Sequence, residues 1–150
     1  MRSNLPSYVR ENSGEWAVVR ENKRSARFRN PKIKRVKVLI VTVDGGMITT
    51  GIRADFVVAH RELVDVIVEL KGSDVPKAIE QIRATVPVWR RHKLAGANHA
   101  ALVVRGKGIH PMTSLQTEKL TRRFEKDFRM KLLIESRRDY EFAEFLPEKL

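Results

Sequence analysis

The sequence predicts an α/β domain with a mixed β-sheet, and three observations support this prediction. Three apolar runs joined by short links, at residues 36–43, 51–59 and 64–71, are typical of an antiparallel meander. A helical pattern begins directly after the third run, at residues 74–86. A fourth apolar run follows at residues 98–105. Because a helix between two strands acts as a crossover, we expect the fourth strand to lie parallel to the third.

The third run is the centre of the predicted sheet. Its valines and isoleucine favour a strand, and Gly72 ends it. Side chains alternate between the two faces of a strand, so one face is apolar and the other carries two acids and a lysine. The apolar face consists of Val64, Val66, Val68 and Leu70, and the mixed face consists of Asp65, Ile67, Glu69 and Lys71.

The link between the second and third strands is short enough for a hairpin, and a hairpin fixes the register. With the turn centred near Glu62, Ala59 is expected opposite Asp65, and Asp55 opposite Glu69. Directly opposed side chains have β-carbons about 5 Å apart, so Asp55 and Glu69 are placed to hold one divalent cation. Asp65 shares the face of Glu69 but lies about 13 Å away along the strand, which excludes it from that site.

The other elements follow from local signals. Ser73 or Asp74 is expected to cap the first helix, in which Pro76 occupies the first turn. A second helix is predicted over residues 113–128, starting at position 113 or 114, and a last short strand over residues 130–134. Asp44 precedes two glycines and is interpreted as a turn residue rather than a ligand.

The two ends of the chain give weaker signals. Residues 1–14 are expected to be irregular or weakly helical, and residues 16–19 fit either a helix start or a short strand. The tail at residues 137–150 alternates charged and aromatic residues, and it either packs or stays loose.

Composition indicates a single domain over residues 1–150, with a 42% apolar fraction that is ordinary for a globular protein. The absence of cysteine excludes disulfides and thiolate zinc sites. No apolar run is long enough to span a membrane and no secretory signal opens the chain, so a cytoplasmic protein is expected.

The formal net charge of +12 predicts attraction to nucleic acid. Residues 20–37 hold nine basic side chains and one acid, and Asn30-Pro31 marks a loop within this stretch. Each contact with a phosphate would release counterions. The residues expected to contact phosphates are Arg20, Lys23, Arg24, Arg27, Lys32 and Lys34, together with Lys77 of the first helix.

Asp55, the sequence Glu69-Leu70-Lys71 and the helix around residues 77–82 resemble the PD-(D/E)xK nuclease superfamily. The resemblance is to short prokaryotic and phage-type members and covers residues 44–105; Ala54 replaces the proline of the motif. It implies a restriction-endonuclease-like fold, in which helices flank the mixed sheet. It also implies a metal-dependent endonuclease that hydrolyses phosphodiester bonds of DNA. Because relatives that cut both strands are often dimers, a homodimer is also considered.

The resemblance implies that Asp55 and Glu69 bind one or two Mg²⁺ ions, for which Mn²⁺ can substitute, with the backbone carbonyl of Leu70 as a further ligand. Oxygen ligands suit a hard cation in phosphate chemistry. By the same resemblance, Lys71 would orient or help deprotonate the attacking water and offset charge on the phosphorane.

Two further roles are implied by position. Gln81 matches a helix position that often carries a polar active-site residue in relatives, although an exposed glutamine is an equal alternative. Relatives often add another acid from the first helix, and Glu21 or Glu11 could supply it here.

Other chemistries lack the residues that they need. The four histidines form no zinc-binding pair, and the Gly106-Lys107-Gly108 sequence lacks the spacing of a Walker phosphate loop. Two alternatives to a nuclease remain: a non-catalytic basic nucleic-acid-binding protein, and an inactive nuclease-fold partner subunit. The first explains the charge but leaves the two acids and the lysine on one face without a role.

Overall fold

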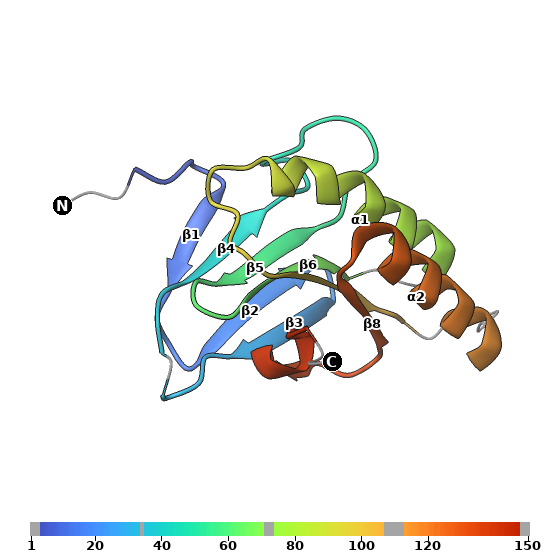
Figure 1. The fold of residues 1–150 in the computed structure, drawn as a ribbon. Coiled ribbons are helices and arrows are strands. Elements are labelled where there is room, and N and C mark those ends of the chain that lie inside the picture. The colour runs from blue at the N-terminus through green and yellow to red at the C-terminus, as the bar shows by residue number, and fades with distance from the viewer. Residues whose placement is uncertain (1–3, 34, 71–73, 107–112, 148–150) are drawn as a thin grey trace.

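The structure, a computed structural model, describes residues 4–33, 35–70, 74–106 and 113–147. The expected phosphate contact Lys34, the catalytic candidate Lys71 and the alternative cap Ser73 lie outside these ranges. The described residues form a mixed α/β fold with a six-stranded sheet, a three-stranded sheet and two α-helices (Figure 1).

The larger sheet has the strand order β1-β4-β5-β6-β7-β8, and the smaller sheet has the order β2-β3-β9. The strands of the larger sheet are β1 (Val9–Asn12), β4 (Val38–Thr42), β5 (Phe56–His60), β6 (Val64–Glu69), β7 (His99–Val104) and β8 (Lys131–Glu135). The smaller sheet contains β2 (Trp16–Glu21), β3 (Arg24–Arg29) and β9 (Asp139–Glu141), and the helices are α1 (Val75–Arg90), α2 (Ser114–Phe128) and the short 3₁₀ turn η1 (Phe142–Phe145).

The predicted centre of the sheet is confirmed. Strands β4, β5 and β6 form an antiparallel meander, and α1 crosses over to place β7 parallel to β6. Strand β8 continues the sheet parallel to β7. Both helices begin at capped residues: the side chain of Asp74 accepts from the Lys77 N–H, and Thr113 forms a capping box with Gln116.

The larger sheet lies between two layers, with α1 and α2 on one face and the smaller sheet on the other (Figure 1). Alternation along β6 divides its side chains between the two cores. Ile67 packs with Ile79 and Ile82 of α1, whereas Val66 packs with Phe28 of the smaller sheet. The predicted division of β6 into two faces therefore holds, but both faces are buried.

The N-terminal prediction was wrong at one point. Residues 9–12 form β1, which pairs antiparallel with β4 at the edge of the larger sheet, where an irregular or weakly helical segment was expected. Residues 16–19, for which helix and strand were both open, belong to strand β2. The basic stretch is a hairpin of β2 and β3 as far as Arg29, and the expected loop follows at Asn30-Pro31.

The C-terminal tail packs as far as the structure describes it. Strand β9 adds to the smaller sheet beside β3, and the aromatic rings that follow enter the core between the two sheets. Tyr140, Phe142 and Phe145 are each at most 1% exposed, and Phe28 stacks with the first two of these rings.

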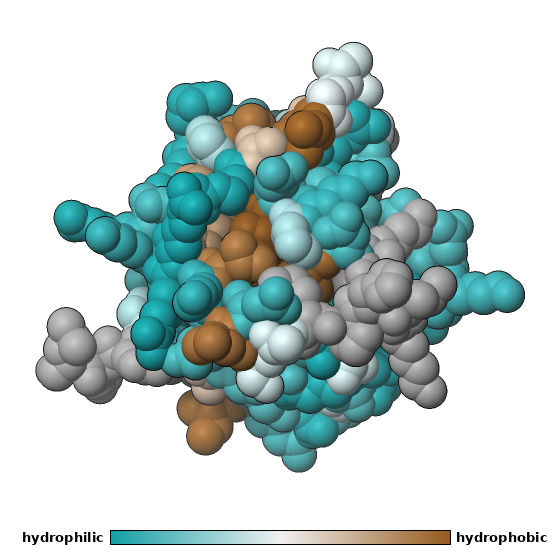
Figure 2. Space-filling view, turned by 90° about the vertical axis from the view of Figure 1, so that its right-hand side faces the viewer, coloured by the Kyte–Doolittle hydropathy of each residue, from teal (hydrophilic) through white to brown (hydrophobic). Residues whose placement is uncertain are grey.

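No helix within the described ranges has the length and apolarity needed to cross a bilayer. The end of the molecule at which α1 and α2 begin presents a mostly hydrophilic surface with hydrophobic residues gathered near its centre (Figure 2).

Candidate metal centre

The β5–β6 hairpin brings Asp55 and Glu69 together. The register pairs Ala59 with Asp65, as predicted, and Phe56 with Val68. Continuing it by one residue places Asp55 opposite Glu69, and the Asp55 N–H donates to the Val68 carbonyl at 3.1 Å. Both acids therefore lie where β5 begins and β6 ends.

Asp55 is held firmly in a nearly closed environment, with 6% of the residue exposed. Its Oδ2 atom accepts from the Leu70 N–H at 2.9 Å, and its backbone carbonyl accepts from the Val43 N–H at 2.9 Å. The preceding residue, Ala54, donates its N–H to Thr85 Oγ1 of α1 at 2.8 Å. These bonds fix the direction of the carboxylate before any ligand arrives.

Glu69 is the most unusual side chain of the site. It is 2% exposed, and its Oε1 atom has no hydrogen-bond partner among the residues that the structure describes. Burial raises the pKa of Glu69 to about 9; the charge of Asp55, a hydrogen bond with Asp55, and the charges of Glu21 and Asp44 add to this rise. A buried carboxylate in this setting is costly unless a cation or a proton compensates it.

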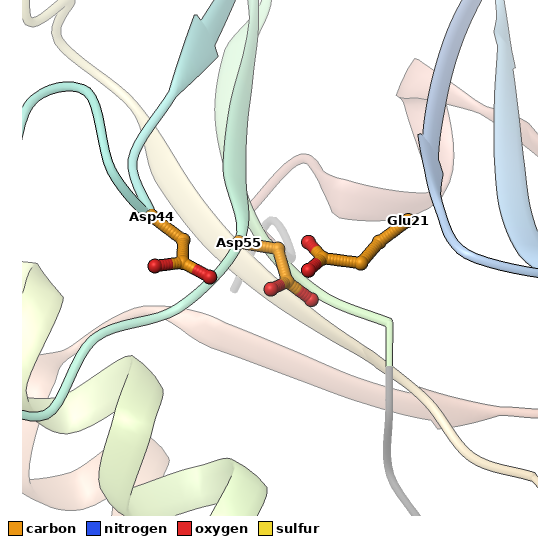
Figure 3. A group of neighbouring side chains, drawn as sticks. All are labelled: Glu21, Asp44 and Asp55. Carbon is orange, nitrogen blue, oxygen red and sulfur yellow. The ribbon is translucent and has the colours of Figure 1, made fainter.

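Glu21 and Asp44 complete the cluster (Figure 3). Carboxylate oxygens of Glu21, Asp44 and Asp55 all lie within 4.8 Å of one another. Glu21, one of the two acids considered as an addition, comes from the end of β2 in the smaller sheet rather than from a helix. The other candidate, Glu11, lies on β1 and pairs with Lys37 at 3.3 Å.

Asp44 belongs to a turn, as expected, but it also joins the cluster, although the sequence interpretation favoured a turn residue over a ligand. Gly45 follows with φ +80°, and the backbone forms a bridge between Asp44 and Ile48. Its Oδ1 atom accepts from Arg53 Nε at 2.7 Å, and 39% of its side chain is exposed. The turn directs this carboxylate back toward Asp55 (Figure 3).

The donor set fits a hard divalent cation. The three groups of the cluster, from Glu21, Asp44 and Asp55, are carboxylates, the ligands that Mg²⁺ and Mn²⁺ favour. Oxygens bound to one Mg²⁺ at about 2.1 Å lie at most about 4.2 Å apart. The 4.8 Å spread of the cluster is within reach of this value by small side-chain rotations. The Oε1 atom of Glu69 provides a further acceptor beside Asp55.

Two predicted residues of α1 lie beside the cluster rather than in it. Gln81 is half-buried and donates its Nε2 to the Arg53 carbonyl at 3.2 Å. Lys77 is exposed. Together with Asp44 they line an open cleft of about 410 Å³ between α1 and the loop before β5.

The basic residues of the β2–β3 hairpin and the loop after it differ in how far their side chains are engaged in contacts within the protein. Arg27 makes a two-point ion pair with Asp139, both contacts at 2.8 Å, and its guanidinium also lies 4.1 Å from the centre of the Trp16 ring. The Arg24 guanidinium packs against Gly106, where an added β-carbon would lie 2.1 Å from it. Among the described residues, the predicted phosphate contacts that are exposed are Arg20, Lys23, Lys32 and Lys77.

Asp65 forms a separate buried site at the opposite end of β6. It accepts from Trp89 Nε1 at 3.0 Å and from the Gly96 N–H at 2.7 Å, and His99 Nε2 lies 3.5 Å away. Burial raises its pKa, while these contacts oppose the rise. Asp65 thus anchors the loop between α1 and β7, consistent with its exclusion from the metal centre.

A larger cavity of about 520 Å³ lies at this opposite end and includes Arg90, His99 and Lys131. Arg90 already donates to the Phe128 carbonyl, so it caps the end of α2.

No protein-family model, curated protein or solved structure matches the chain. The carboxylate cluster is therefore interpreted from its own geometry.

Proposed function

We propose that the protein is a metal-dependent endonuclease that hydrolyses DNA, with an active site of the PD-(D/E)xK type and the corresponding restriction-endonuclease-like topology. The observation that carries the proposal is the buried pair of Asp55 and Glu69, in which a carboxylate oxygen of Glu69 has no partner among the described residues. In a chain with a net charge of +12, carboxylate oxygens of Glu21, Asp44 and Asp55 lie within 4.8 Å of one another, and their charges act on the buried Glu69. Arg53 pairs with Asp44 of this cluster.

Asp55 and Glu69 would hold Mg²⁺ or Mn²⁺, with Asp44, Glu21 and the Leu70 carbonyl as further ligands. When bound, the cation supplies Lewis acidity and charge compensation for phosphodiester hydrolysis. The protein's part is to keep the carboxylates oriented, and the Leu70 N–H bond to Asp55 does this directly.

We assign Lys71 to the attacking water, because its spacing from Glu69 matches the lysine of the motif that the sequence resembles. Its ammonium group would orient the water and balance negative charge as the water oxygen bonds to phosphorus. The phosphorus–oxygen bond to the leaving sugar then breaks; the attacking water releases a proton to solvent, and the leaving oxygen takes up a proton from solvent. Gln81 would assist from α1, where its amide already contacts the loop that carries Asp55.

Nucleic acid fits the charge distribution better than a small phosphoester does. Lys23, at the turn of the β2–β3 hairpin, follows Glu21 closely, so a backbone that contacts this turn passes beside the acids. A purely structural DNA-binding protein would use the exposed lysines but would have no need for a buried Glu69 whose Oε1 lacks a partner within the described ranges.

The test is cleavage of supercoiled plasmid and of branched DNA with Mg²⁺ or Mn²⁺. We expect nicking by the wild type and none above background by Lys71→Ala or Asp55→Asn. Glu62→Gln changes an exposed acid at the far turn of the same hairpin and serves as the control with full activity.

Metal binding is measured separately by titration calorimetry with Mn²⁺. Asp55→Asn should abolish the binding, while Lys71→Ala should retain it. Absence of Mn²⁺ binding by the wild type would refute the metal centre, and binding without cleavage of any DNA would favour an inactive partner subunit. Double-strand breaks at low enzyme, together with the molecular mass in solution, test whether two copies act together.

A further inference from the structure

The cleft beside the acids has features that the cleavage site alone does not explain. Its volume of about 410 Å³ lies within the range of about 300–1,000 Å³ typical of sites for small organic groups. One wall is the loop before β5, with Ile52 and Arg53, and the other is the face of α1 formed by Lys77, Glu80 and Gln81. Asp44 belongs both to this lining and to the carboxylate cluster, so the cleft adjoins the cluster.

The charges around the cleft balance. Arg53 and Lys77 contribute two cations, and Asp44 and Glu80 contribute two carboxylates. Arg53 is already paired with Asp44 at 2.7 Å. A neutral group with hydrogen-bonding edges suits such a lining better than a phosphate does, because a phosphate would meet the two carboxylates.

The two walls are joined before a ligand arrives. Gln81 Nε2 of α1 donates to the Arg53 carbonyl of the loop at 3.2 Å, and the Arg53 guanidinium donates to the Gly51 carbonyl at 2.6 Å. Gly51 itself has φ +85°, a conformation that favours glycine and turns the loop at the rim. The cleft is therefore a formed feature of the fold rather than a gap between loose segments.

Ile52 stands at the rim with 63% of its surface exposed, which makes it one of three large hydrophobic residues exposed to this extent among those described. Apolar side chains in such positions are used by DNA-binding proteins as wedges that separate stacked bases. A base released from its stack can enter a pocket in which polar groups read its edge. Glu80 and Gln81 provide acceptor oxygens for the exocyclic amines of a base.

We propose that the cleft receives one unpaired nucleobase beside the scissile phosphate, so that the preferred substrate is DNA with a bulged, mismatched or single-stranded residue at the cut. The position relative to the scissile phosphate rests on the proposed nuclease function; the occupancy of the cleft by a base does not. Unpaired residues are preferred because extracting a base from a matched duplex costs unpairing and unstacking free energy.

Cleavage tests the preference with labelled oligonucleotides of one sequence as a matched duplex, as a duplex with one bulged nucleotide, and as a single strand. We expect the wild type to cut the last two at least about tenfold faster than the matched duplex. Ile52→Ala should lose about tenfold on the bulged substrate. Leu115→Ala, which alters an equally exposed hydrophobic residue at 62% on α2, should keep the wild-type rate. Equal rates on all three substrates, or an Ile52→Ala protein identical to the wild type, would overturn the inference.

Binding tests the cleft without any cleavage. Asp55→Asn protein in chelator is mixed with DNA that carries the fluorescent base 2-aminopurine in a mismatch. We expect fluorescence to rise on binding, because the base leaves its stack, and to rise much less when Ile52→Ala is combined with Asp55→Asn. If fluorescence rises with Asp55→Asn and rises much less with the double variant, but the wild type cleaves no DNA, the cleft assignment is supported and the nuclease function is refuted. Unchanged fluorescence at saturating protein would overturn the assignment. A rise in fluorescence with an RNA that carries 2-aminopurine, but not with the DNA, would overturn it as well.

Discussion

Replacing Glu69 with glutamine should stabilise the metal-free protein, and the gain should grow with pH. Glu69 is 2% exposed beside Asp55, so the folded protein holds this carboxyl in its protonated form over a wide pH range. A glutamine at this position would keep the size and shape of the side chain, and its amide could donate to the Asp55 carboxylate. The variant removes the ionisable group without opening a cavity.

The sign follows from proton linkage. The pKa of Glu69 is raised to about 9 in the folded protein from 4.5, its ordinary value, which the unfolded chain keeps. Below pH 4.5 Glu69 is protonated in both the folded and the unfolded state, so its ionisation does not lower the free energy of unfolding of the wild type. Between pH 4.5 and pH 9 the folded state carries one more proton than the unfolded state, so wild-type stability falls by at most about 1.4 kcal/mol per pH unit. From pH 5 to pH 8 the difference between Glu69→Gln and wild type should therefore widen by about 2–4 kcal/mol.

Urea unfolding in chelator at pH 5, 6.5 and 8 measures this difference directly. Glu62→Gln, on the exposed turn of the same hairpin, provides the control. Its free energy of unfolding should change with pH in the same way as that of the wild type. Millimolar Mn²⁺ should then reverse the order at pH 8, since binding to the native state stabilises only a protein that retains the ligand. If the free energies of unfolding of wild type and Glu69→Gln change with pH in the same way, the pKa of Glu69 is not raised by burial and neighbouring acids, and the reasoning is refuted.

Three further predictions test other parts of the structure. Lys32→Ala should lower the salt dependence of DNA binding by about one unit of slope, whereas Arg27→Ala should lower it less, because Arg27 is paired with Asp139; fluorescence anisotropy at several salt concentrations distinguishes them, and equal effects would contradict the ion-pair argument. Asp65→Ala should cost about 1–3 kcal/mol in urea unfolding, because the Trp89 Nε1–H and the Gly96 N–H, which both donate to Asp65 Oδ2, would lose their acceptor; a neutral result would contradict the role of Asp65 as an anchor. Gly46→Ala should cost about 1–3 kcal/mol, because a β-carbon would lie 2.3 Å from the Thr42 carbonyl oxygen; thermal melts that leave it level with the control Gly14→Ala, where the nearest atom is at 3.4 Å, would contradict the predicted clash.

The part of the fold that the sequence predicts is the part governed by neighbouring residues. The alternation along β6 and the short link at Glu62 were enough to derive the register between β5 and β6. That register places Asp55 opposite Glu69 without any knowledge of the rest of the chain. The start of α1 was also predictable, because Asp74 caps it and Pro76 fits its first turn.

The smaller sheet could not be derived in the same way, because its partners are distant in sequence. Strand β3 pairs with β9, which lies more than 100 residues further along the chain. A signal was nevertheless present on β3, where the buried residues Ala26 and Phe28 alternate with Ser25, Arg27 and Arg29. The nine basic side chains of residues 20–37 are as typical of a phosphate-binding loop as of an exposed strand face, so the alternation alone does not identify the strand.

Asp44 illustrates a different difficulty. The two glycines that follow it correctly indicate a turn, but a turn residue can also be a ligand when the loop returns to the sheet. The return depends on the Val43 and Asp44 N–H groups, both of which bond to the Asp55 carbonyl, and this contact spans two strands. Composition and spacing do not determine such a tertiary contact.

Because Glu21 comes from the smaller sheet, the proposed metal binding would depend on how the two sheets pack. Asp44 and Asp55 belong to the larger sheet and its connecting loop, whereas Glu21 reaches them only if the β2–β3 hairpin packs correctly on the opposite face. Phe28 and the rings of Tyr140 and Phe142 form the contact that holds this hairpin. A cation bound by all three acids would therefore also stabilise the association of the two sheets. Repulsion among the same acids in the absence of a cation would weaken that association. The charge at the site therefore affects the stability of the packing between the two sheets.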